Sequence, residues 1–240
     1  MNAAPLHVAG ERLMLDPAGV LFWPAAKLLV VADLHLEKGS AAAGRGALVP
    51  PWDTRITLDR LLLRIQHWRP EIVVALGDSF HDRRAALRLT LSDGERVRRL
   101  GSLARLVWVL GNHDPTPPEG LPGESAQEFA LGPLRFRHQA VDGLPARQAE
   151  LCGHHHPKAR IATRGGAISR PCFVADSRRI ILPAFGAYTG GLDVTSPPIA
   201  RLFPRGGRAF LLGAERLFSF ALNGVPSSPP RSRTGARLNC

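Results

Sequence analysis

The chain has 240 residues, a formal net charge of +11 and 45% hydrophobic residues, which is enough apolar material for a folded core. Its three cysteines, Cys152, Cys172 and Cys240, show no CxxC spacing, so neither a disulfide framework nor a thiolate zinc site is expected. No segment resembles a signal peptide and no apolar run is long enough to span a bilayer, so we expect a cytoplasmic protein without a membrane partner. The positive charge indicates either a polyanionic partner or merely the free use of Arg in a GC-rich genome.

The first half of the chain alternates short apolar strands with helices. Residues 11–15 and 20–23 predict a hairpin that leads into a buried strand over residues 28–32. Apolar residues at helical spacing predict a helix over residues 52–68, and a second buried strand follows over residues 72–76. A strand, a helix and a strand in this order predict a parallel crossover, in which both strands end at the same edge of the sheet.

A basic, Arg-rich stretch follows the second buried strand. Ser92 and Glu95 have the spacing of a capping box and predict the start of a helix. The arginines of this stretch either line a nucleic-acid groove or form an ordinary solvated helix face. Just before the arginines lie His81 and Asp82. These two residues either lie close behind the residues of a functional site or form a simple pair in a loop.

Three apolar strands of the first half each end in polar side chains that suit a metal ion or an acid–base group. The third of these strands begins at Leu106 and ends at Gly111, where a residue without Cβ allows a sharp turn. The polar residues that follow the three strands are Asp33, His35, Asp78, Asn112, His113 and Asp114.

In the second half, Gly and Pro separate short apolar runs, which predicts a second, largely antiparallel sheet packed on the first. The runs cover residues 126–131, 134–138, 150–153, 172–175, 179–182 and 209–212. This half adds His138 and the segment GHHHP, in which His154 and His156 would point to the same side of an extended chain. We expect one domain over residues 1–224, followed by a disordered basic tail over residues 225–240.

Several residues are candidates for substrate contact. The segment GAYTGGLD over residues 186–193 is either a loop that approaches the metals or a tight connector. The candidates in this segment are Tyr188 and Thr189. Lys38, after the first buried strand, and Arg98 and Arg99, in the Arg-rich stretch, are the other candidates.

The ligand candidates offer oxygen and imidazole nitrogen without thiolate: Asp33, His35, Asp78, Asn112, His138, His154 and His156. Such a set suits Mn²⁺, Fe or Zn²⁺ better than Cu(I), and better than Ca²⁺, which prefers oxygen alone. These ligands exceed the needs of one ion, whereas two ions that share a carboxylate use them all. Two ions roughly 3.5–4 Å apart can hold a phosphate and activate water.

The order of these motifs resembles that of the calcineurin-like metallophosphoesterases. The motifs are Asp33-x-His35, Gly77-Asp78, Gly111-Asn112-His113-Asp114, a later His and Gly153-His154-x-His156. Longer segments, among them VADLHLEKGS, ALGDSFHD and LPAFGAYTGGLDV, are similar to the bacterial ligase-associated DNA damage response endonucleases. This similarity covers most of residues 10–195.

The resemblance implies an α/β (α+β) fold, a two-sheet β-sandwich flanked by helices, with a di-metal site at the carboxyl ends of strands. It implies that Asp33, His35 and His156 hold one ion, that Asn112, His138 and His154 hold the other, and that Asp78 bridges them. His113 would act near the leaving oxygen as a general acid or electrostatic stabiliser, oriented by Asp114.

The function implied by the resemblance is metal-dependent phosphodiester hydrolysis by a hydroxide that bridges the two ions, in a DNA nuclease of DNA repair. DNA would be the substrate, and a DNA ligase and a helicase would be functional partners. The two divalent ions are expected to be Mn²⁺, with Fe or Zn²⁺ as alternatives. Two other functions stay open: a phosphatase or small-molecule (cyclic-nucleotide) phosphodiesterase, and a basic DNA-binding partner of a repair ligase.

Overall fold

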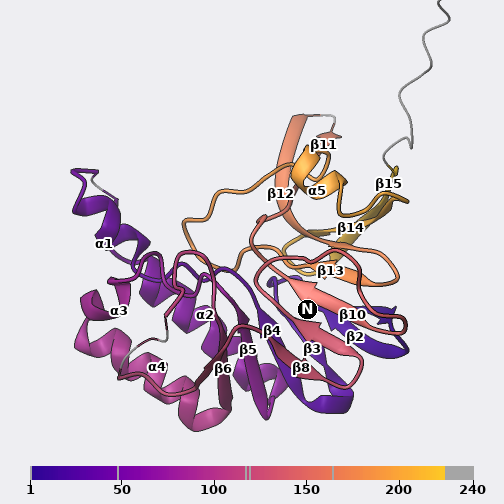
Figure 1. The fold of residues 1–240 in the computed structure, drawn as a ribbon. Helices are drawn as coiled ribbons and strands as arrows, with labels where there is room; N and C mark the ends of the chain where they lie inside the picture. The colour runs from indigo at the N-terminus through magenta and orange to yellow at the C-terminus, as the bar shows by residue number, and fades with distance from the viewer. Residues whose placement is uncertain (1, 48, 117, 119, 164, 225–240) are drawn as a thin grey trace, which may run out of the picture.

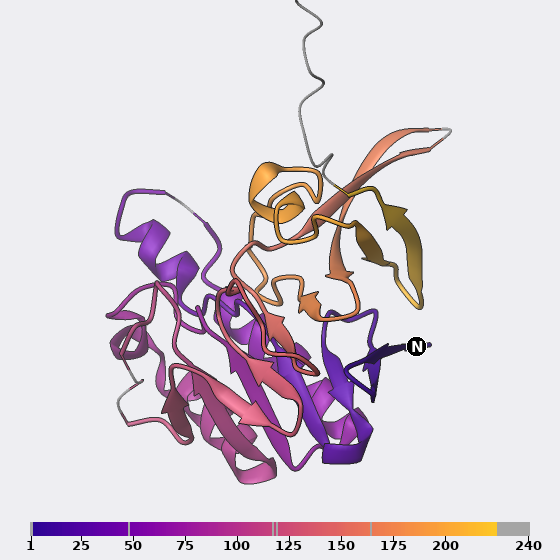
Figure 2. The same cartoon turned by 45° about the vertical axis from the view of Figure 1, so that its right-hand side comes forward.

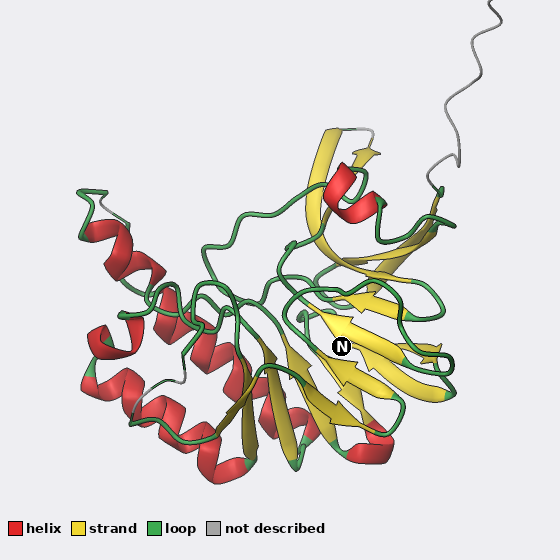
Figure 3. Ribbon diagram, in the orientation of Figure 1, coloured by secondary structure: helices red, strands yellow, loops and turns green. Residues whose placement is uncertain are grey.

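The computed structural model describes residues 2–224 except Leu48, Pro117, Glu119 and Arg164, so the predicted tail over residues 225–240 lies outside the described residues. Two sheets pack face to face, and most of the helices cover the outer face of the first sheet (Figures 1 and 3). This arrangement confirms the predicted two-sheet fold flanked by helices. None of the helices in the described part of the chain is long and apolar enough to cross a membrane.

The first sheet contains seven strands that neighbour one another in chain order. They are β1 (Ala4–Val8), β2 (Glu11–Leu15), β3 (Leu21–Trp23), β4 (Leu28–Val31), β5 (Ile72–Leu76), β6 (Arg105–Val109) and β7 (Glu124–Ala126). Strands β1 to β4 pair antiparallel, which confirms the predicted hairpin, and β4 to β7 pair parallel, which confirms the predicted crossover. The carboxyl ends of β4, β5 and β6 therefore meet at one edge.

The helices are short except for two that cover the first sheet. They are η1 (Pro24–Ala26), α1 (Lys38–Ala43), α2 (Asp53–Trp68), α3 (Ala85–Arg88), α4 (Leu91–Leu103) and α5 (Pro197–Ala200). The capping box predicted at Ser92 and Glu95 is wrong by two residues. Thr90 is the N-cap of α4, with extended backbone angles, and its hydroxyl accepts the backbone N–H of Asp93 at 3.1 Å. The same Ser/Thr-x-x-acid spacing occurs at both places, so spacing alone does not select the cap.

The second sheet has eight strands and is mostly antiparallel, as predicted. They are β8 (Phe129–Leu131), β9 (Leu134–Phe136), β10 (Ala149–Cys152), β11 (Lys158–Thr163), β12 (Gly166–Ala175), β13 (Arg179–Ile181), β14 (Gly207–Leu212) and β15 (Leu217–Leu222). Strand β10 pairs parallel with both β9 and β13. The hairpin formed by β11 and β12 projects beyond the body of the sheet (Figure 2).

The single strand predicted over residues 126–131 is wrong, because this stretch contributes to both sheets. Strand β7 ends at Ala126 and extends the first sheet beside β6, whereas β8 begins at Phe129 in the second sheet. The polar residues Gln127 and Glu128 lie between them. Phe129 then packs against the core between the sheets, so the two short strands bury their side chains in different surroundings.

The core explains why β4 can hold a functional site rigidly. Leu28 and Val30 lie in the core between the two sheets, and Leu29 and Val31 lie in the core between the first sheet and the helices. All four side chains are fully buried, as expected for a strand covered on both faces. The chain that leaves β4 toward Asp33 is therefore anchored on both sides.

Candidate metal centre and active site

Loops at the carboxyl ends of five strands bring all seven candidate ligands together. Backbone hydrogen bonds hold two of these loops side by side, because the N–H of Asp33 donates to Gly77 at 3.3 Å and that of His35 donates to Asp78 at 2.9 Å. The ligands are Asp33 and His35 after β4, Asp78 after β5, Asn112 after β6, His138 after β9, and His154 and His156 after β10.

The first cluster contains Asp33, His35 and His156. His35 Nε2 lies 3.2 Å from His156 Nε2, and His156 Nε2 lies 3.4 Å from Asp33 Oδ1. Asp33 is fully buried, and its carboxylate also accepts the backbone N–H of His154 at 3.0 Å. The histidine segment after β10 and the loop after β4 thus meet at one carboxylate.

The second cluster is built around His138. Its Nε2 lies 2.9 Å from Asn112 Oδ1, 3.1 Å from His154 Nδ1 and 3.4 Å from Asp78 Oδ2. Asp78 Oδ2 also lies 3.9 Å from His35 Nε2 of the first cluster. Asp78 is therefore the carboxylate that faces both clusters.

The donor atoms of the second cluster fit a cation. His138 Nδ1 lies 2.9 Å from the carbonyl oxygen of Leu76, and a carbonyl only accepts, so Nδ1 carries the hydrogen. Nε2 is therefore the nitrogen that faces the oxygens of Asn112 and Asp78. A divalent ion between these atoms would use the Nε2 lone pair and both oxygens, and the carbonyl of Leu76 is the kind of partner that orients a ligating histidine. The mixed nitrogen and oxygen set suits Mn²⁺, Fe or Zn²⁺.

Five of the ligands adopt left-handed backbone angles that L-residues rarely take. The φ angles are 53° at Asp33, 45° at His35, 46° at Asp78, 69° at His154 and 46° at His156. Each such residue costs of order 1 kcal/mol or more, and this strain persists only where the surrounding fold imposes it. Its concentration at these ligands indicates that the fold holds them in place for function.

Gly111 acts by allowing a close approach rather than by adopting a left-handed turn. A Cβ at this position would lie 2.2 Å from Asp78 Oδ1 and 2.7 Å from Asp114 Oδ1, and the φ of Gly111 is not in the left-handed region. The sharp turn expected at Gly111 is therefore less important than the space it leaves for Asp78.

Burial and neighbouring charges set the protonation of the ligands. Burial, reinforced by the charge of His156, lowers the pKa of His35 to about 3, so this imidazole stays neutral, as a metal ligand must. Burial opposes ionisation of Asp78, but the hydrogen bond and the charge of His138 outweigh it and lower the pKa of Asp78 to about 2. For His138, burial is outweighed by Asp78 and Asp33, which raise its pKa.

His113 lies at the open side of the clusters. Its Nδ1 donates to the carbonyl of His81 at 2.8 Å, and its Nε2 lies 4.0 Å from Asp78 Oδ2. The side chain is 41% exposed, so a substrate can reach it. The ring of His81 stacks on that of His113 at 5.4 Å, and His35, His81 and His113 bring one nitrogen each within 4.8 Å of one another. His81, whose role the sequence left open, therefore belongs to the site.

The carboxylate of Asp114 binds backbone N–H groups rather than the ring of His113. The expectation that Asp114 orients this ring is therefore corrected. Its Oδ1 accepts the N–H groups of Gly111 and Asp78 at 2.9 and 3.0 Å. Its Oδ2 accepts those of Ser79 and Phe80 at 2.7 and 3.1 Å. Burial raises the pKa of Asp114 to about 6, against the effect of these N–H donors. The sequence showed a carboxylate beside His113, but only the tertiary contacts show what it binds.

The candidate substrate contacts fall in different places. Lys38 begins α1 beside the clusters, and its charge contributes to lowering the pKa of both His35 and His81. Arg98 and Arg99 are exposed on α4, in the half of the helix that leads toward the start of β6. The structure therefore brings Lys38 to the site and leaves the two arginines away from the clusters.

The loop after β13 passes close to the ligands, as one of its two interpretations expected. A Cβ at Gly186 would lie 2.2 Å from the carbonyl oxygen of Leu34, and one at Gly191 would lie 2.2 Å from that of His156. The hydroxyl of Tyr188 donates to Pro50 at 3.1 Å, and that of Thr189 donates to Gly186 at 3.0 Å. Both hydroxyls thus hold the loop in place, and a substrate role for either stays a prediction.

Two clusters of nitrogen and oxygen side chains that share one carboxylate, at the carboxyl ends of sheet strands, are the arrangement expected of metal-dependent phosphoester hydrolases. Residues 26–182 match the calcineurin-like phosphoesterase family, and the chain belongs to this family. It is a hydrolase that acts on phosphoester bonds.

The solved structures similar to this chain include a nuclease and two less similar proteins. The crystal structure of the nuclease MPE of Pseudomonas putida has 30% sequence identity and a TM-score of 0.71, and the match covers 90% of this chain and 100% of that one. Yfce, a phosphoesterase from E. coli, has 14% identity and a TM-score of 0.41 over 82% of this chain and 99% of that one. AQ665 from Aquifex aeolicus, described as of unknown function, has 16% identity and a TM-score of 0.38 over 58% of this chain and 81% of that one. A search of curated proteins gave no match.

Proposed function

We propose that this protein is a metal-dependent DNA nuclease, a phosphodiesterase that holds two divalent ions, Mn²⁺ by preference, and works in DNA repair in the cytoplasm. The observation that carries the proposal is Asp78, whose Oδ2 faces His138 of one ligand cluster and His35 of the other. The similarity to the nuclease of Pseudomonas putida over 90% of the chain supports a nucleic-acid substrate.

The chain's own residues would bind and protonate the substrate. Two ions in the clusters would neutralise phosphate charge and lower the pKa of a bound water. His113 is fixed by the carbonyl of His81, so that its Nε2 faces the reaction side. When protonated, this nitrogen can donate to the leaving oxygen, which is the role of a general acid. Asp114 keeps the loops that carry Asp78 and His113 together through its backbone hydrogen bonds.

Cations beside the clusters fit a polyanion better than a small phosphate ester. Burial lowers the pKa of Lys38, and the negative charge of Asp53 opposes this effect. The positive charges of Arg45 and Lys158 lower the pKa of Lys38 further, so these three cations lie within electrostatic reach of one another. Across the described residues, none of the three forms an ion pair. Cations left without carboxylate partners beside a phosphate-binding site can contact the phosphates that flank the cleaved one.

A DNA ligase and a helicase are proposed as functional partners, because a nuclease that creates or trims ends supplies substrates to such enzymes. This part of the proposal rests on the motif resemblance. Copurification of the full chain with either enzyme from cells that express all of them tests it directly, and a chain that is always recovered alone would contradict it.

An assay with Mn²⁺ tests the function by comparing single-stranded DNA, duplex DNA, cyclic nucleotides and bis-p-nitrophenyl phosphate. We expect cleavage of DNA and of the chromogenic diester, loss of both in EDTA, and recovery with Mn²⁺. Hydrolysis of cyclic nucleotides without DNA cleavage would favour the small-molecule alternative. DNA binding without any hydrolysis would favour a binding partner of a ligase.

A further inference from the structure

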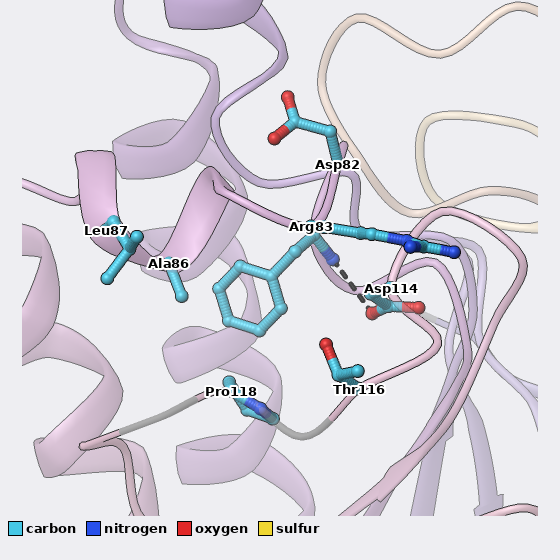
Figure 4. A pocket seen from close by; sticks show the side chains of 8 residues that line it. Asp82, Arg83, Ala86, Leu87, Asp114, Thr116 and Pro118 are labelled. Carbon is cyan, nitrogen blue, oxygen red and sulfur yellow. Dashed lines mark hydrogen bonds between the residues drawn. The ribbon is translucent and has the colours of Figure 1, made fainter.

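A pocket of about 120 Å³ opens beside the metal centre, between α3 and the loop after β6. Ala86 and Leu87 stand on one side of it and Asp114 and Thr116 on the other, with Pro118 below and Arg83 above (Figure 4). Its volume approaches that of cavities of about 150 Å³ that accept a benzene-sized ring. The pocket can therefore take one flat ring but not a longer chain segment.

The lining is apolar where a ring would pack and polar at the edge. Phe80, Ala86, Leu87 and Pro118 supply the apolar part, and the hydroxyl of Thr116 supplies a hydrogen-bonding group. Phe80 is only 3% exposed and packs against Trp108 at 5.9 Å, so this wall is fixed. Leu87 is 74% exposed, which leaves a large apolar side chain in water at the mouth. Apolar faces with a few polar groups are typical of sites for flat heterocycles.

The pocket is joined directly to the catalytic loops. Asp114 lines it and also accepts the backbone N–H groups of Asp78 and Phe80. Asp82, another lining residue, follows His81, whose carbonyl fixes His113. A group bound here would thus lie next to a phosphate held at the metal centre, in the position of a neighbouring nucleotide.

The charge around the pocket fits a polyanionic chain. Arg83 lines the pocket and also an adjacent groove of about 500 Å³, together with Arg45 and Arg84. Within the described part of the chain, the side chains of these three arginines form no ion pair or hydrogen bond. Arg88, by contrast, is neutralised by Asp82 at 2.7 Å. Free cations beside an apolar ring site match a nucleotide, which joins a base to phosphate.

We propose that this pocket, formed by Phe80, Ala86, Leu87, Thr116 and Pro118, binds the nucleobase of the nucleotide next to the scissile phosphate. Arg83 faces the phosphate that follows that base. The proposal rests on the proposed nuclease function and adds to it that the enzyme reads an unpaired base. Stacking of this kind uses the flat face of the base rather than its hydrogen-bonding edges.

The test compares two chromogenic diesters that differ only in the base. Thymidine 5′-(p-nitrophenyl phosphate) and its abasic deoxyribose analogue are hydrolysed by the full chain with Mn²⁺, and kcat/KM is measured for each. Wild type should prefer the thymidine ester by about tenfold or more, the effect of one stacked base. Leu87→Ala, which removes a wall, and Ala86→Phe, which fills the pocket, should bring this preference toward unity.

The matched control is Leu63→Ala, because Leu63 is another exposed leucine, 56% exposed, on α2 and outside the pocket. It should keep the wild-type preference. Because Leu87 is exposed, Leu87→Ala decides the question even if Ala86→Phe does not fold. Equal kcat/KM for the two esters in wild type, or a strong preference that survives in Leu87→Ala, would overturn the proposal. Cleavage of a single-stranded oligonucleotide by the same preparations tests the nuclease function separately.

Discussion

At the scale of single residues, the site depends on side chains whose hydrogen bonds leave one atom free for chemistry. His138 gives Nδ1 to Leu76 and keeps Nε2 for the cluster, and His113 gives Nδ1 to His81 and keeps Nε2 for the substrate. Asp78 differs from both, because one of its oxygens faces both clusters. These differences predict different effects of substitution.

Asp78→Asn should impair the metal centre more than the removal of a ligand that faces one cluster, such as His156→Ala. The amide removes the negative charge that both ions would share, so we expect the metal content of the chain and the hydrolysis of bis-p-nitrophenyl phosphate to fall together, the latter at least about 10²-fold. Elemental analysis of the purified variants beside the rate measures both. Two ions per chain and near-normal activity in Asp78→Asn would contradict the shared carboxylate.

His113→Ala should keep the metal content and lose turnover, because the ring is fixed through His81 and faces Asp78 from 4.0 Å. Loss of a general acid lowers the rate by roughly 10²–10⁴-fold. The loss should shrink for a p-nitrophenyl ester, whose leaving group needs no proton. A fall in metal content in step with activity would instead identify His113 as a ligand.

At the scale of elements, strand ends and the pairings between strands fix where these residues lie. Gly111, just after β6, leaves room for Asp78 just after β5. On the second sheet, fully buried Glu150 of β10 binds Arg179 of β13, and it also binds Arg137, which follows β9, at 3.0 Å. The close approach at Gly111 positions ligands, and the ion pairs of Glu150 join the strands that carry the loops of His138 and His154.

Gly111→Ala should destabilise the fold and remove metal, because its Cβ would lie 2.2 Å from Asp78 Oδ1. Overpacking of this kind costs about 1–3 kcal/mol of the free energy of unfolding. Gly190→Ala is the control, since a Cβ there meets nothing within 4 Å. Denaturant unfolding and metal analysis of the two variants check this, and equal stability and metal content would show that the loops can move apart.

Arg179→Met should be strongly destabilising, because it removes a partner from the fully buried carboxylate of Glu150. Breaking a buried ion pair costs about 3–5 kcal/mol, and the remaining ion pair with Arg137 should keep the effect near the lower end. Urea unfolding measures it. The double variant Arg179→Met with Glu150→Gln should recover part of the stability, and no recovery would mean that Arg179 acts through packing rather than charge.

At the scale of the whole molecule, the positive charges discussed above form two groups that lie on different parts of the structure. Lys38, Arg45 and Lys158 gather beside the metal centre, with Arg83 and Arg84 along the adjacent groove. Arg98 and Arg99 lie on an exposed face of α4 instead. If DNA follows the first group, these cations release its counterions.

Arg45→Ala combined with Lys158→Ala should lower the slope of log K against log salt for a single-stranded oligonucleotide by roughly 1.4, about 0.7 for each phosphate that is no longer neutralised. Charge reversal of Arg98 and Arg99 tests whether α4 also contacts the oligonucleotide. In both cases the measurement is the affinity for the oligonucleotide across a salt series. An unchanged slope in the first double variant would show that DNA takes another path.

The sequence by itself determined the features that depend on local pattern. The apolar run of β4 and the helical spacing along α2 predicted buried elements, and the parallel order of β4 and β5 predicted that Asp33 and Asp78 meet at one edge. This works because strand ends in a parallel sheet converge whatever the rest of the fold does.

Only the tertiary structure decided the contacts between distant segments. His35 and His156 meet across 121 positions of the chain, and the carbonyls that fix His138 and His113 come from other loops. The tertiary structure alone also decided three further features: the backbone hydrogen bonds of Asp114, the position of His81 in the site and the division of residues 126–131 between two sheets. Such contacts follow from how the two sheets pack. Every residue has a backbone carbonyl, so the sequence does not show which carbonyl will accept a hydrogen bond from a histidine.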